Sequence, residues 1–152
     1  MVDSTTLNTL RDRPMTDDRD LTRFVTALLE RAVEPRAWLL FIDSAGCMTD
    51  VMMPIDGLSG DPTETVAMPA SGAVSAADLL ATRVSQIVDE TPAGAVVVVW
   101  ERPGGPGRSS DLRRWSEPMR AAFAHQPDGL RAQFVLADDG AHLVSEPQVR
   151  AA

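Results

Sequence analysis

The sequence predicts an α/β (α+β) protein that has one mixed β-sheet of about five strands with helices on its faces. Three observations lead to this fold class. Short, continuous apolar runs indicate buried strands, apolar stripes at helical spacing indicate amphipathic helices, and clusters of Gly, Pro and Asp separate the two kinds of segment. The predicted order is α-β-β-α-β-α-β-β, and such alternation is typical of a sheet with helices packed on it.

The length of 152 residues suits one hydrophobic core. We expect residues 1–15 to form an N-terminal tail, residues 16–146 a single globular domain, and residues 147–152 a C-terminal tail.

Charge and composition narrow the possible partners and compartments. The chain carries 22 acidic residues against 14 basic ones, a net charge of −8, which argues against a nucleic-acid partner. We find no apolar run long enough to span a bilayer and no secretory signal, so we expect no membrane association. A single cysteine, Cys47, excludes an intrachain disulfide and favours a cytoplasmic location.

The N-terminal half begins with a predicted helix, for which Thr16 is the expected N-cap and Pro35 the end. Its apolar stripe runs through residues 21–33 at helical spacing. Ala37–Ile42 is apolar throughout, which indicates a strand buried on both faces. Cys47–Ile55 is expected to pair with it in a hairpin.

The middle of the chain contains a long connection, a helix and the strongest strand signal. Residues 56–72 are rich in Gly, Pro, Ser and Thr, which is typical of a loop. Ser75 and Asp78 resemble a capping box at the start of the second helix. Ala95–Trp100 contains four consecutive valines, so we expect it to be the central strand.

A Gly/Pro-rich turn then leads into a third helix, with Ser109 or Ser110 as its cap. Pro118 lies inside its apolar pattern and predicts either a kink or two short helices. Ala132–Ala137 and Ala141–Ser145 are expected to form a closing hairpin.

The order of elements and the strand-turn-helix of residues 94–115 resemble the JAB superfamily, also called MPN or JAMM, and most closely its RadC-like branch. There the strand ends in His-x-His-Pro and a Ser-x-x-Asp opens the next helix. The two histidines and the aspartate hold a catalytic zinc, and an upstream glutamate is the general base. In the present sequence Trp100 and Arg102 stand at the histidine positions, followed by Pro103. Asp111, after Ser109 or Ser110, matches the Ser…Asp pair at shortened spacing.

This resemblance implies a degenerate JAB-like domain that lacks the zinc-binding histidines. An arginine at a ligand position opposes a divalent cation, and the two histidines, His125 and His142, lie in other segments. The family's hydrolase activity is therefore not carried over. What we expect instead is a non-catalytic protein-interaction domain without a cofactor or metal, which acts through an unknown protein partner or through self-association.

An alternative function is binding of a small molecule or anion at the Gly/Pro-rich turn, with enzymatic activity left open. Backbone N–H groups of a tight turn and a following helix N-terminus can hold an anion. The candidate ligand residues are Arg102, Gly104, Gly105, Arg108, Ser109, Ser110 and Asp111.

Two tryptophans flank this turn, Trp100 on the strand and Trp115 on the helix. They can be interpreted as core residues or as an exposed aromatic patch for a partner protein, and we take them as the candidate partner surface.

Overall fold

The computed structural model describes residue 14 and residues 17–34, 36–55, 64–68, 72–90, 94–103, 112–124 and 129–144. The expected tails lie outside these residues, apart from Pro14. The elements follow in the order α2 (Asp18–Leu29), β1 (Arg36–Ile42), β2 (Met48–Ile55), β3 (Thr65–Met68), β4 (Gly72–Ser75), α3 (Ala76–Glu90), β5 (Ala95–Glu101), α4 (Leu112–Ala122), β6 (Leu130–Ala137) and β7 (Gly140–Leu143).

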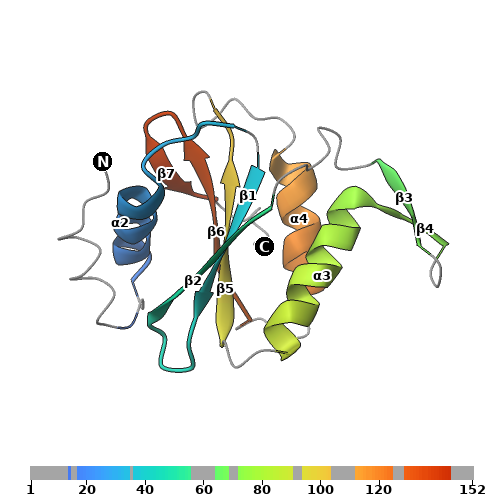
Figure 1. The fold of residues 1–152 in the computed structure, drawn as a ribbon, viewed down its shortest axis with the longest axis horizontal. Helices are drawn as coiled ribbons and strands as arrows, with labels where there is room; N and C mark the ends of the chain where they lie inside the picture. The colour runs from blue at the N-terminus through green and yellow to red at the C-terminus, as the bar shows by residue number, and fades with distance from the viewer. Residues whose placement is uncertain are drawn as a thin grey trace, which may run out of the picture.

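The main sheet has five strands in the order β2-β1-β5-β6-β7, which confirms the predicted fold class (Figure 1). β5 is parallel to β6, and every other neighbouring pair is antiparallel. The prediction of a loop over residues 56–72 is wrong in part, because β3 and the start of β4 form a separate two-stranded sheet there.

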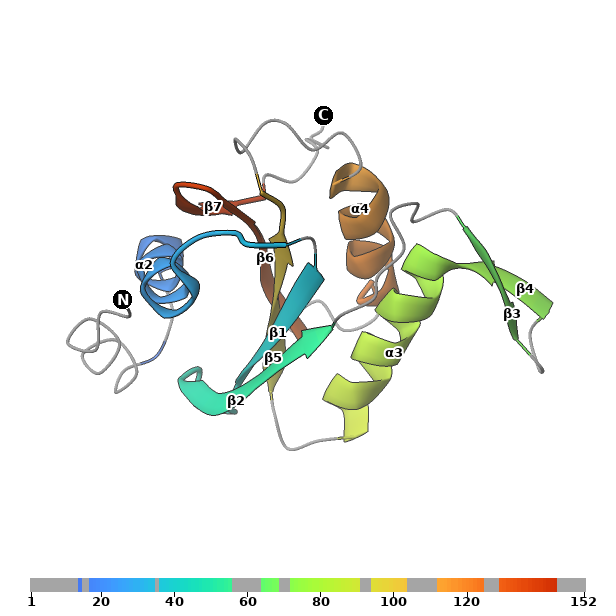
Figure 2. The same ribbon diagram turned by 45° about the horizontal axis from the view of Figure 1, so that its top comes forward.

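β5 is the central strand, and all seven of its residues are buried. Its side chains alternate between two cores. Val97 and Val99 pack under α2, whereas Val96, Val98 and Trp100 pack against α3 and α4. Figure 2 shows α2 on one side of the sheet and both other helices on the opposite side.

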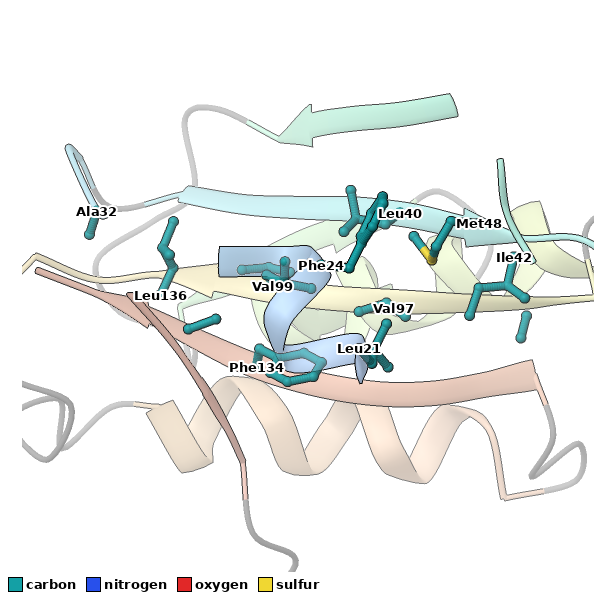
Figure 3. Packing of buried hydrophobic residues seen from close by; sticks show 13 residues of the cluster. Leu21, Phe24, Ala32, Leu40, Ile42, Met48, Val97, Val99, Phe134 and Leu136 are labelled. Carbon is teal, nitrogen blue, oxygen red and sulfur yellow. The ribbon is translucent and has the colours of Figure 1, made fainter. Parts of the chain in front are cut away.

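The core beneath α2 takes Leu21, Phe24 and Val25 from that helix as its buried members. Leu21 and Phe24 lie over Val97, Val99 and Phe134 of the sheet (Figure 3). Both α2 side chains are at most 1% exposed. The helix therefore uses one narrow apolar face, as the stripe in the sequence predicts.

Both ends of α2 differ from the prediction. The N-cap is Asp17 rather than Thr16, because the Asp17 carboxylate accepts a hydrogen bond from the Arg19 N–H at 2.8 Å. The helix ends at Leu29, and Glu30 follows with a φ of 67°. Val33, which the stripe placed on the buried face, is 71% exposed.

The early end of α2 has a physical cause in the residues that follow it. The Ala32 N–H donates to the Ala137 carbonyl of β6 at 2.9 Å. The N–H groups of Val33 and Glu34 donate to the Glu101 carboxylate of β5. These acceptors replace the helical carbonyls, so the chain leaves the helix several residues before Pro35.

The other helices follow the prediction more closely. The Asp78 N–H donates to the Ser75 hydroxyl at 3.1 Å, which confirms the expected cap of α3. α4 is one helix that contains Pro118, so the interpretation as two short helices is wrong.

The short strand β7 is held by α2. The Ala141 N–H donates to the Thr26 hydroxyl at 3.1 Å. Gly140 has a φ of 121°, a value at which side chains are strained, and a Cβ there would lie 3.2 Å from Thr26 Cγ2. Glycine at this position permits the close approach of helix and strand.

Candidate functional site at the end of the central strand

The carboxyl end of β5 presents Trp100, Glu101 and Arg102 in succession. β5 and β6 are parallel and end at the same edge of the sheet, where the Arg102 N–H donates to the Leu136 carbonyl at 2.9 Å. Strand alternation directs Trp100 toward α3 and α4 and Glu101 toward the opposite face, which α2 covers. This edge is where α/β proteins usually place their sites.

Trp100 fills the space between β5 and α4. Its ring centroid lies 5.8 Å from that of Trp115, at an interplanar angle of 37°. Its indole N–H donates to Gln133 Oε1 at 2.8 Å, and the Gln133 amide donates to the Ser116 carbonyl at 3.1 Å. A chain of buried hydrogen bonds thus links β5, β6 and α4.

The prediction that Trp100 and Trp115 form a partner surface is wrong. Their exposures are 0% and 1%, so both belong to the core. Trp100 continues the buried valine strand, and Trp115 lies on the apolar face of α4. The indole N–H of Trp115 is itself buried, and it has no hydrogen-bond acceptor among the residues that the structure describes.

Glu101 is the buried charge of the site, with an exposure of 1%. One carboxylate oxygen accepts the N–H groups of Val33 at 2.5 Å and Glu34 at 3.0 Å. The other accepts Arg36 Nε at 2.6 Å and Trp38 Nε1 at 2.9 Å. We call these five residues the Glu101 clamp.

The clamp keeps Glu101 ionised. Burial raises the pKa of Glu101, but the hydrogen bonds from Arg36, the Val33 N–H, Trp38 and the Glu34 N–H prevail, and the pKa lies below its usual value. Each oxygen already accepts two donors, and solvent does not reach the group. Glu101 is therefore suited to joining the segment after α2 to β1 and β5, and poorly suited to accepting a proton from a substrate.

Sequence reasoning missed this role of Glu101. The signal that could have indicated it is an acidic residue directly after six apolar strand residues, because a charge at the end of a buried strand requires partners.

The side chain of Arg102 contacts main-chain carbonyl groups. Its Nη1 donates to the Glu101 carbonyl at 2.8 Å and to the Arg36 carbonyl at 3.4 Å, and its Cζ lies 5.9 Å from the centroid of the Trp100 ring. These contacts position the guanidinium beside the clamp. The other candidate ligand residues of the turn lie outside the described part of the chain: Gly104, Gly105, Arg108, Ser109, Ser110 and Asp111. The anion site at the turn therefore remains a prediction.

Groups that could bind metal are dispersed over the structure. Within the described ranges, no cluster of three or more His, Cys, Asp or Glu side chains is placed to hold an ion. His142 on β7 contacts Asp139 at 2.8 Å, and Cys47 is half-buried immediately before β2. His125 lies outside these ranges.

None of the helices in the described segments combines the length and the apolar character needed to cross a membrane. A comparison with protein-family models finds no matching family, and a comparison with curated proteins finds no matching sequence.

Proposed function

We propose that this chain is a non-catalytic protein-interaction domain of JAB-like architecture whose metal site has decayed. The observation that carries the proposal is the Trp100–Trp115 pair. Trp100 stands where the resemblance assigns the first metal-binding histidine, and its ring packs at 5.8 Å on Trp115 of the following helix. The helices and the strands of the main sheet also follow the order that the resemblance implies, with β3 and β4 added between β2 and α3.

The chemistry of these side chains supports binding rather than hydrolysis. A catalytic zinc site requires three protein ligands and an open fourth position. Indole is a hydrogen-bond donor only, and the donor of Trp100 is used by Gln133. Arg102 is a cation, and the saturated carboxylate of Glu101 is a poor general base. The residues at this strand end therefore favour packing over catalysis.

Apolar side chains at the rim of the sheet support an interaction role. Val51 and Met53 on β2 are 55% and 39% exposed. Both side chains are available for contact with a protein partner.

Metal analysis tests the proposal. Protein purified without a histidine tag is incubated with excess zinc, desalted and analysed by mass spectrometry, beside a His142→Gln variant that removes an adventitious ligand. We expect no retained zinc and a thermal midpoint that EDTA does not change. One zinc per chain in both proteins, or a midpoint lowered by the chelator, would overturn the proposal.

A further inference from the structure

The two-stranded sheet β3–β4 stands apart from the body of the protein. In Figures 1 and 2 it projects beyond α3, away from the main sheet. Its pairing runs from Thr65↔Ser75 to Met68↔Gly72, and its principal contacts within the described chain are with α3. An isolated two-stranded hairpin is marginally stable at best in water, and among the described residues this arm has little cover beyond α3.

The outer edge of β3 presents main-chain groups for pairing. The Ala76 N–H donates to the Glu64 carbonyl at 2.8 Å, which makes Glu64 and Ala76 a hydrogen-bonded pair of the ladder. Such pairs alternate in antiparallel sheets, so the N–H and C=O groups of Thr65 and Ala67 point away from β4. They form a row of donors and acceptors along the outside of the arm.

The outer strands of the main sheet, in contrast, are protected. β2 carries a bulge, because Leu40 and Ile42 of β1 oppose Met52 and Met48, and Pro54 removes a main-chain donor. On β7, the hydroxyl of Thr26 caps the Ala141 N–H. Natural edge strands commonly carry such devices against strand addition. β3, with the sequence Thr-Val-Ala-Met, has no charge, proline or bulge.

The same composition favours a second copy of the chain as the occupant. Across a two-fold axis, β3 of one copy pairs with β3 of the other. A charged residue in β3 would then lie close to the same charge in the second copy. Neither β3 nor β4 contains a charged residue, although the chain has a net charge of −8. The arm is thus a place where two acidic copies can meet without opposing like charges.

We propose that two copies associate through antiparallel pairing of their β3 edges, which joins the two arms into a four-stranded sheet. The inference rests on the proposed function as an interaction domain and specifies self-association as its mode. Four-residue strands bury a small area, so the dimer is weak and forms at high protein concentration. Salt screens the repulsion between the two acidic bodies, so dimerisation strengthens as ionic strength rises.

Sedimentation equilibrium tests the dimer over a wide range of protein concentration. We expect the average mass to rise from that of one chain toward that of two, and to rise further in high salt. In Ala67→Pro the outward-facing donor of β3 is lost while the hairpin bonds remain, so this variant should stay monomeric. Ala73→Pro, which makes the same change on the outer edge of β4, is the matched control and should dimerise as the wild type does.

A wild-type chain that is monomeric throughout, or an Ala67→Pro variant that dimerises normally, overturns the proposal. A dimer that Val51→Asp abolishes also overturns it, because the contact would then lie on β2. If Ala67→Pro fails to fold by circular dichroism, NMR dilution of the wild type decides. The amides of Thr65 and Ala67 must then shift with concentration. A monomeric chain without zinc refutes the dimer alone, whereas a zinc-bound chain refutes the proposed function whatever its mass.

Discussion

The Glu101 clamp makes a quantitative prediction for Glu101→Gln. The substitution keeps the shape of the side chain but replaces one acceptor oxygen by an NH2 group. Two of the four donors then face another donor. Burying a donor without an acceptor costs about 1–3 kcal/mol, so the two together cost about 2–6 kcal/mol. The Arg36 side chain is 23% exposed and can turn toward water. The amide oxygen should face the immobile backbone N–H groups, and the NH2 group should face the side chains of Arg36 and Trp38. We therefore expect the free energy of unfolding to fall by about 2–4 kcal/mol.

Urea unfolding at neutral pH, followed by tryptophan fluorescence, measures this loss. Glu34→Gln is the matched control, because it also removes one negative charge beside Arg36. Its carboxylate lies 3.6 Å from Arg36 Nη1 and is 55% exposed, so the expected change is below about 1 kcal/mol. If Glu101→Gln and Glu34→Gln have the same urea midpoint within error, and the same slope of unfolding free energy against urea concentration, the clamp does not stabilise the fold and the prediction is wrong.

Three further outcomes follow from the same structure. The pKa of Glu101 is lowered by folding, so its contribution is fully present above the ordinary carboxyl pKa. The stability gap between the wild type and Glu101→Gln should be constant near neutral pH and shrink as the pH falls below 4.5 in a urea series. Gly140→Ala should cost about 1–3 kcal/mol in the same assay, because of its φ of 121° and the close contact with α2. Gly72→Ala, at a φ of 77° with open space around it, should cost less. Gln133→Leu should lower stability by about 1–3 kcal/mol, because it leaves the buried Trp100 N–H without an acceptor, and an unchanged urea midpoint would contradict this.

Local signals in the sequence were sufficient for most of the main sheet. The valines of Ala95–Trp100 predicted the buried central strand, because a run that is apolar on both faces has few other places to lie. The Ser75 cap and the closing hairpin also depend on residues a few positions apart. β3 and β4 were missed because each is only four residues long and neither shows a strong apolar alternation.

The features of the candidate site depend on contacts between distant parts of the chain. Glu101 receives a donor from Val33, which is 68 residues away in the sequence. The same contact ends α2 early, so the helix boundary could not be predicted from the helix itself. The burial of Trp100 depends on Trp115 and Gln133, which different elements provide. The sequence pattern left both a core and a surface interpretation open.

The position of β5 has a consequence for how the protein unfolds. Val97 and Val99 of this strand face α2, and Val96 and Val98 face α3 and α4, so the loss of β5 opens both cores at once. We therefore expect the core beneath α2 and the core beneath α3 and α4 to unfold together. Tryptophan fluorescence can follow the unfolding of both layers, because Trp38 lies on the α2 side and the Trp100–Trp115 pair lies beneath α4. Each face of the sheet thus has an intrinsic tryptophan fluorophore.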